Sequence, residues 1–196
     1  GLRNLGSPLT ARNGNMLSAL GMLLAVVATL VGAHIVNWQW IIIGIIIGSL
    51  LGAMVAFKAA MTQMPEMIAL LHGCGALSSV FVDWTAYQVH GIADLTGSIT
   101  MYISIVIGGL TFTGSAIAWG KLSEKLPGKA ILLPGQRWIN IGLLLSILIL
   151  GAMFIADPTQ HNIFLIILGL SLIFGIFSVL PIGGADMPVV ISVLNS

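Results

Sequence analysis

Charged residues are scarce in this chain of 196 residues: they make up 7% of it, whereas hydrophobic residues make up 58%. Globular proteins carry about a quarter charged residues. A core built from a chain of this length cannot hide so much apolar surface from water, so lipid is the expected surrounding. The net charge is only +1 and no run of basic residues occurs, which excludes an obvious nucleic-acid-binding segment.

Several motifs of soluble enzymes are missing as well. The single cysteine, Cys74, rules out an internal disulfide framework and is expected to be a small packing residue. The four histidines are scattered and no CxxC or HExxH motif occurs, so we predict no metal site. Neither a GxGxxG motif nor a Walker loop is present, so this chain is expected to bind no nucleotide by itself.

The apolar residues fall into six segments, each close to the roughly 20 residues that a bilayer requires. The predicted spans are residues 16–33, 40–57, 65–84, 97–119, 138–155 and 163–180, with polar loops at 85–94 and 127–136. We therefore predict an all-α polytopic transmembrane helical bundle, with six spans plus the start of a seventh. Its parts are a cytoplasmic-side loop at 1–15, a six-span domain at 16–181, and an inner loop with a truncated further helix at 182–196. Both ends are expected to be cut from a longer protein, and no signal peptide is apparent.

The distribution of charge supports this count of spans. Six spans place every lysine and arginine on one side of the membrane, and positive residues favour the cytoplasmic side. These residues are Arg3, Arg12, Lys58, Lys121, Lys125, Lys129 and Arg137. The five tryptophans fall at predicted span ends, which is typical of an aromatic belt. Gly44, Gly48 and Gly52 lie four apart on one face of the second span and predict a close-packing helix surface.

His72 is the ionisable side chain that this pattern places within a span. Polar groups in spans are costly and usually face a bundle interior, a cavity or a proton relay. A histidine can gain and lose a proton near neutral pH. The neighbours Gly73, Gly75 and Ala76 are small and leave room for close helices or for water. From the residues alone, a proton site and a buried neutral packing histidine are equally open readings.

Three further polar positions accompany His72. Glu66 follows Pro65 in a first helical turn, where a carboxylate complements the helix dipole. Ser115 shares a helix face with Thr111, and these hydroxyls could bond His72, hold water, or bond back to their own helix. Asp186 lies between two glycines and a helix that opens at Pro188, so it could cap that helix or contact a soluble partner.

These residues also carry a resemblance to a known family. The runs Met-Pro-Glu at 64–66 through Leu-His at 71–72, Thr-Phe-Thr-Gly-Ser at 111–115, Leu-Leu-Pro-Gly at 132–135 and Gly-Gly-Ala-Asp-Met-Pro-Val-Val at 183–190 resemble the β subunit of the proton-translocating NAD(P) transhydrogenase. The resemblance covers essentially the whole chain, as a fragment of the membrane domain. Gly73-Cys74-Gly75 departs from the bulkier residues expected after the histidine, which bears on local packing rather than on role.

The resemblance implies a function that couples proton passage to hydride transfer from NADH to NADP⁺. It implies that His72 is the proton-relay histidine, that Ser115 lines the same path, that Glu66 marks the inner mouth, and that Asp186 lies near the junction with an NADP(H)-binding domain. NADP(H) and NAD(H) would be bound by soluble domains of the complete enzyme, not by this fragment, which has no hydride-transfer site of its own. The implied partners are membrane lipid, the α subunit, the NADP(H)-binding domain of the same subunit and a second copy of the enzyme, in a bacterial inner membrane.

Two rival classes make different predictions. A solute transporter or channel subunit would have a midplane site with broken helices, whereas no predicted span has an internal proline. A purely structural subunit would tolerate His72→Asn in every assay.

Overall fold

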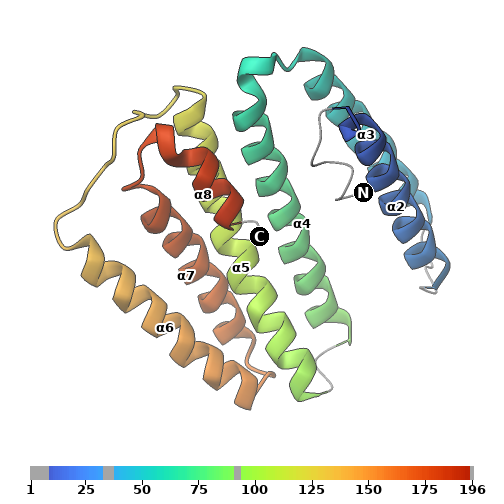
Figure 1. Ribbon diagram of the computed structural model, residues 1–196. Helices are drawn as coiled ribbons and strands as arrows, with labels where there is room; N and C mark the ends of the chain where they lie inside the picture. Colours follow the sequence, from blue (N-terminus) through green and yellow to red (C-terminus); the bar gives the residue numbers. More distant parts are fainter. Residues whose placement is uncertain (1–8, 33–37, 91–93, 195–196) are drawn as a thin grey trace. The chain divides into compact units, whose positions relative to one another are not determined.

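A computed structural model describes residues 9–32, 38–90 and 94–194 (Figure 1). All regular structure in this part of the chain is helical. The chain divides into two compact units, residues 1–58 and residues 59–196. The first unit contains α2 (Ala11–Gly32) and α3 (Trp38–Lys58). The second contains the 3₁₀ turn η1 (Met61–Gln63), α4 (Met64–His90), α5 (Leu95–Leu122), α6 (Gln136–Ala156), α7 (His161–Val179), the 3₁₀ turn η2 (Gly184–Asp186) and α8 (Met187–Leu194).

Six of these helices are long and apolar enough to cross a membrane. A helix pairs its backbone N–H and C=O groups within itself. An apolar helical segment can therefore lie in hydrocarbon, whereas an extended segment with unpaired backbone groups cannot. The prediction of an all-α polytopic fold with six spans is confirmed, and α8 is the predicted start of a seventh helix. The chain is a multi-pass membrane protein.

The first unit consists of two very apolar helices with little burial of their own. No described residue of α3 is buried. A Cβ added to Gly44, Gly48 or Gly52 would have no atom within 4 Å. No described residue of this unit therefore packs on the glycine face of α3. The close-packing surface that the glycine spacing predicts stays a prediction.

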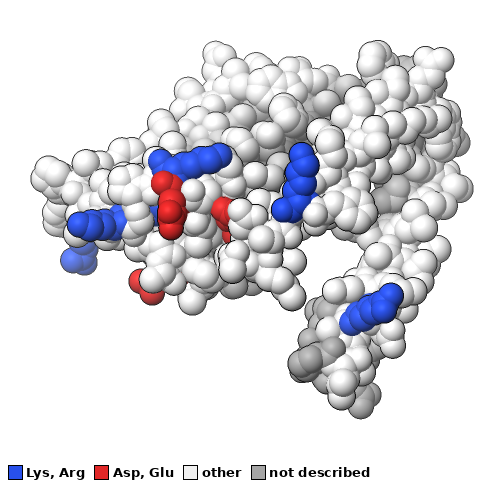
Figure 2. Space-filling view, turned by 90° about the horizontal axis from the view of Figure 1, so that it is seen from above, with Lys and Arg blue, Asp and Glu red and all other residues white. Residues whose placement is uncertain are grey.

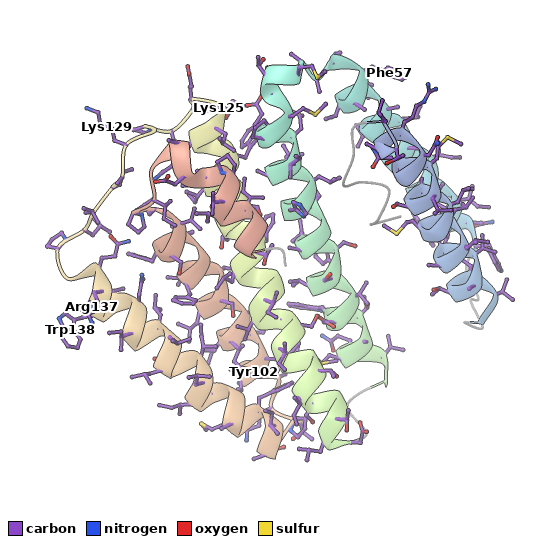
Figure 3. All side chains as sticks on the ribbon, viewed as in Figure 1. Phe57, Tyr102, Lys125, Lys129, Arg137 and Trp138 are labelled. Atoms are coloured by element: carbon purple, nitrogen blue, oxygen red, sulfur yellow. The ribbon has the colours of Figure 1, made fainter. Side chains whose placement is uncertain are left out.

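The second unit is organised around α5. Figure 1 shows α4, α5, α7 and α6 lying side by side in that order, and α8 packs against the last turns of α5. Residues buried on α5 include glycines on both of its flanks, so neighbouring helices approach closely on two sides. All four basic residues of this unit lie on the last turn of α5, on the connection after it, or at the start of α6: Lys121, Lys125, Lys129 and Arg137 (Figures 2 and 3). These four residues thus belong to one connection and its flanking turns, and their position on one side of a membrane stays a prediction.

Three predicted boundaries were wrong. Residues 11–15, predicted as loop, form the first turns of α2, while residues 1–8 lie outside the described part. Residues 85–90, predicted as loop, continue α4, so Asp83 and Trp84 lie inside a helix rather than at its end. The final helix begins at Met187, one residue before the predicted Pro188, and follows η2. In the first two cases polar side chains lowered the local hydropathy although the backbone stayed helical.

The end of the unit away from the basic residues is held by aromatic stacking. Tyr87 of α4 stacks on His161 and Phe164 of α7, with ring centroids 5.6 and 4.8 Å apart. The Tyr87 hydroxyl donates to the Pro158 carbonyl at 2.9 Å. In the same turn, hydrogen bonds from Thr159 and then Gln160 hold the pKa of the Asp157 carboxyl below its usual value. These contacts fix the start of α7 against the last turns of α4.

Gly108 sets the distance between α4 and α5. A Cβ at this position would lie 2.7 Å from Val80 Cγ2 and 3.3 Å from the Ala76 carbonyl oxygen. We therefore expect Gly108→Ala to lower the free energy of unfolding by about 1–3 kcal/mol, since added volume in a packed interface is destabilising. Thermal unfolding in lipid nanodiscs measures this effect. The matched control is Gly142→Ala on α6, where an added Cβ meets nothing within 4 Å; equal melting temperatures for the two variants would contradict the assignment.

Candidate functional site

The predicted site residues of α4 and α5 meet at the interface between these helices. Gly73 of α4 faces Ser115 of α5, and a Cβ at Gly73 would lie 3.3 Å from Ser115 Cβ. His72, the preceding residue of α4, is half-buried. The small glycine thus brings the Ser115 hydroxyl to the level of the imidazole. We call this contact region, His72 with Gly73 and Ser115, the histidine site.

The Ser115 hydroxyl is the notable group of the histidine site. Ser115 is 0% exposed, yet its Oγ has no hydrogen-bond partner among the described residues. Leaving such a group without a partner costs on the order of 1–3 kcal/mol. Of the three possibilities left open by the sequence, a direct hydrogen bond from Ser115 to His72 and a bond back to its own helix are both absent from the described part of the chain, which leaves a bound water. A buried polar group of this kind favours a site that takes up water or a proton-carrying group.

The neighbouring threonines behave differently. Thr113 Oγ1 donates toward the Gly109 carbonyl of its own helix at 3.1 Å and the Leu172 carbonyl of α7 at 2.8 Å. The reading in which hydroxyls of this run bond back to their own helix is thus confirmed for Thr113. Thr111 is buried and has interaction partners of its own. Of the three hydroxyls in this run, Ser115 alone is unpartnered within the described residues.

Glu66 lies at the basic end of the unit, in the first turn of α4. It is buried, with 8% of its surface exposed, and it lines a polar pocket of about 230 Å³. Thr62 and Gln63 line the same pocket before α4, and Ser123 and Glu124 line it after α5. The pocket therefore opens where α4 begins and α5 ends, which is the place that the sequence predicts for Glu66.

An apolar cluster occupies the depth between Glu66 and the histidine site. Its buried members come from four helices: Ala69, Ala118, Val179, Met187 and Ile191. Ala69 lies between Glu66 and His72 along α4, and Ala118 lies one turn from Ser115 along α5. We call these five residues the inner apolar cluster. Because α8 supplies Met187 and Ile191, the short last helix closes the core at this depth.

Asp186 lies at the turn that delivers α8 to this cluster. Its side chain is exposed, and its backbone N–H donates to the Gly183 carbonyl at 3.1 Å within η2. The Gly184 N–H donates to the Gly128 carbonyl at 2.8 Å, which joins η2 to the connection between α5 and α6. Asp186 therefore directly precedes the buried Met187 while its carboxylate faces outward. Asp186 takes no part in the contact between Gly73 and Ser115 that defines the histidine site.

Lys121 is a buried residue that the sequence predicted only as a marker of orientation. It is 3% exposed, and its Nζ donates to the carbonyls of Leu180 at 2.6 Å and Ile182 at 2.7 Å. A longer contact of 3.5 Å reaches the Lys129 carbonyl. The ammonium thus satisfies carbonyls at the end of α7, where a helix leaves its last carbonyls unpaired. By contrast, Lys125 is exposed and lies over the Trp119 ring at 4.0 Å.

Asp83 is a second residue whose setting the sequence did not predict. Since α4 continues to His90, this carboxylate lies within a candidate span rather than at its outer edge. His72 is therefore not the sole ionisable side chain inside α4. A correct prediction of the end of α4 would have identified it.

The fold and these positions together define a polytopic all-α membrane protein whose polar groups line helix interfaces. Comparisons with known proteins give the family. The chain matches the family described as NAD(P) transhydrogenase beta subunit over residues 1–196, and it belongs to that family. Two relatives named NAD(P) transhydrogenase subunit beta, one from Rhodospirillum rubrum and one from a designated strain of that species, are each 36% identical over 203 residues. The match covers 100% of this chain and 44% of each relative, so the chain spans less than half their length.

Proposed function

We propose that this chain is the proton-conducting part of a transhydrogenase that couples proton passage to hydride transfer from NADH to NADP⁺. The observation that carries the proposal is the buried, unpartnered Ser115 hydroxyl at the level of His72 inside a span. His72 would take a proton from the outer side and release it inward toward Glu66. Histidine suits this role because it exchanges a proton near neutral pH, and the hydroxyl at its level can hold a water molecule.

The inner apolar cluster gives this path a barrier. Apolar side chains offer a proton no hydrogen-bonded carrier, so the route from the histidine site to Glu66 is interrupted at Met187 and Ile191. Movement of α8 would restore continuity, and α8 follows directly from Asp186. A domain that docks at Asp186 could therefore shift the barrier as its ligand state changes. Such coupling is reciprocal for binding, so nucleotide binding would also shift proton binding at His72.

The acidic lining of the polar pocket supports placing the nicotinamide nucleotides outside this chain. A dinucleotide pyrophosphate is commonly held by backbone N–H groups at a glycine-rich helix start. The polar pocket is lined instead by Glu66 and Glu124, whose carboxylates would repel phosphate groups. We assign NAD(H), NADP(H) and the hydride-transfer step to soluble domains outside this chain.

The proposed setting follows from this assignment. Lipid surrounds the spans of a bacterial inner membrane, and the basic end faces the cytoplasm. The partners are the NADP(H)-binding domain of the same subunit, the transhydrogenase α subunit and a second copy of the complete enzyme. Asp186, exposed at the basic end, is the residue of the site placed to meet the NADP(H)-binding domain.

Reconstitution of the complete enzyme in liposomes tests the proposal. With a pH-sensitive dye trapped inside, we expect the internal pH to change while NADH reduces NADP⁺, and an imposed pH gradient to change the rate of that reaction. Hydride transfer without any pH change would overturn the proposal. Flux of a labelled solute through the membrane part, in the absence of nucleotide-binding domains, would instead favour a solute transporter.

A further inference from the structure

Asp83 lies in the outer half of α4, on the side of the helix that faces α5. Its Oδ2 atom is shielded from solvent and has no hydrogen-bond partner among the described residues. Ser104 of α5 lies within interaction range of this carboxyl group on the facing helix. An ionised carboxylate with one shielded, unpartnered oxygen inside a span is costly, whereas a group that binds a proton there relieves that cost.

Helix register places Asp83 on the same interface as the histidine site. Asp83 follows His72 by eleven residues, which is close to three helical turns and about 16 Å along the axis. On the antiparallel α5, Ser104 precedes Ser115 by the same eleven residues. The close approach of Gly108 to Ala76 and Val80 lies between the two levels. The α4–α5 interface therefore carries an ionisable residue and a serine at each of two depths: His72 with Ser115, and Asp83 with Ser104.

The other ionisable groups around this level are engaged elsewhere. On α4, the Tyr87 hydroxyl bonds the Pro158 carbonyl. On α5, the Tyr102 hydroxyl donates to the Ile147 carbonyl at 3.2 Å. On α7, the His161 ring packs on Trp84 and Tyr87, with centroids 6.0 and 5.6 Å away. Within the described residues, no cation pairs with Asp83, so the proton itself is the positive charge available to neutralise it.

We propose that Asp83 is a second proton-binding residue of the path, in its outer half, and that Ser104 positions its carboxyl group. The proposal rests on the proposed function. The unpartnered Oδ2 takes a proton from the outer side, and the O–H bond so formed breaks when the proton passes inward through intervening water to the imidazole of His72. No electrons are exchanged, and Asp83 returns to its starting state after each proton.

The test uses the complete enzyme in liposomes and compares Asp83→Asn with Asp157→Asn. Asparagine keeps the size of the side chain but cannot carry a proton. We expect Asp83→Asn to slow proton uptake about a hundredfold, which is the low end of the loss for a proton-transfer group. The rate should also lose one of the two limbs of its dependence on external pH. Asp157 lies outside the spans, so Asp157→Asn should keep the wild-type dependence of proton uptake on external pH.

Further variants separate a proton-binding role from a purely structural one. Asp83→Glu should restore the limb that Asp83→Asn removes from the dependence of proton-uptake rate on external pH. Ser104→Ala should keep proton uptake but move that limb to a different pH. Wild-type rates and pH profiles in folded Asp83→Asn would overturn this inference and leave the proposed function standing, provided that His72→Ala still blocks proton uptake. Should Asp83→Asn fail to fold, an unmoved limb in Ser104→Ala would overturn it equally. Absence of proton movement in the wild-type enzyme would overturn both.

Discussion

Replacing His72 with alanine in the complete enzyme is expected to lower proton uptake and coupled hydride transfer together, by about a hundredfold or more. The variant removes the proposed proton-binding group of the histidine site but leaves Ser115 and the close approach of Gly73 in place. No hydrogen bond to the His72 imidazole occurs among the described residues, so its removal leaves no hydrogen-bonded partner unsatisfied. Parallel measurement of internal pH and NADPH formation in liposomes checks the result.

Cys74→Ala is the matched control for this experiment. Cys74 lies two residues further along α4 and is exposed, so its replacement alters the same helix without touching the α5 interface. It should retain wild-type rates. Fully coupled proton movement in His72→Ala would refute the relay role, and wild-type behaviour of His72→Asn in every assay would identify a structural histidine.

Met187→Ala is expected to make the membrane part leak protons when no nucleotide is reacting. Met187 is 0% exposed and fills the inner apolar cluster beside Ala69 and Ala118. Its truncation leaves a cavity and should lower the free energy of unfolding by about 2–5 kcal/mol. A cavity between the histidine site and the pocket at Glu66 gives water a place to bridge the barrier. Decay of an imposed pH gradient in liposomes measures the leak.

Two companion variants define the cause of that leak. Val189→Ala shortens a side chain on the same helix that is 66% exposed, and it should leave both stability and gradient decay unchanged. Met187→Leu nearly conserves volume and should keep the barrier closed. If Met187→Ala and Val189→Ala leaked equally, the inner apolar cluster would not be the barrier.

The existence of the helices was predictable because hydropathy reports the property that a lipid-exposed helix needs. Their ends were harder. Asp83, Thr85 and Gln88 lower the hydropathy of the last turns of α4, but those side chains can face another helix or one another's backbone while the helix continues. Thr85 Oγ1, for example, bonds the carbonyls of Phe81 and Val82 within α4.

The site was predictable only where one residue type carries its own signal. His72 and Glu66 stood out because an ionisable residue beside or inside an apolar run is unusual. The sequence could not predict that the Ser115 hydroxyl lacks a hydrogen-bond partner, because the presence of a partner depends on the neighbouring helices and not on the residue type. The burial of Lys121 was not predicted because it depends on hydrogen bonds to the carbonyls of Leu180 and Ile182, some sixty positions away along the chain.

Lys121 also has an electrostatic consequence for any path that ends nearby. Its ammonium is held inside the protein, one turn beyond Ala118, and its hydrogen-bond partners among the described residues are carbonyl groups. Dipoles orient around a charge without cancelling it, and a low-dielectric surrounding extends its field. A hydronium or metal cation approaching the inner apolar cluster would therefore meet a positive potential while Lys121 is protonated. On the proposed path, the residue that holds the end of α7 in place would also repel free cations, and protons handed between bound groups would be the charges able to pass.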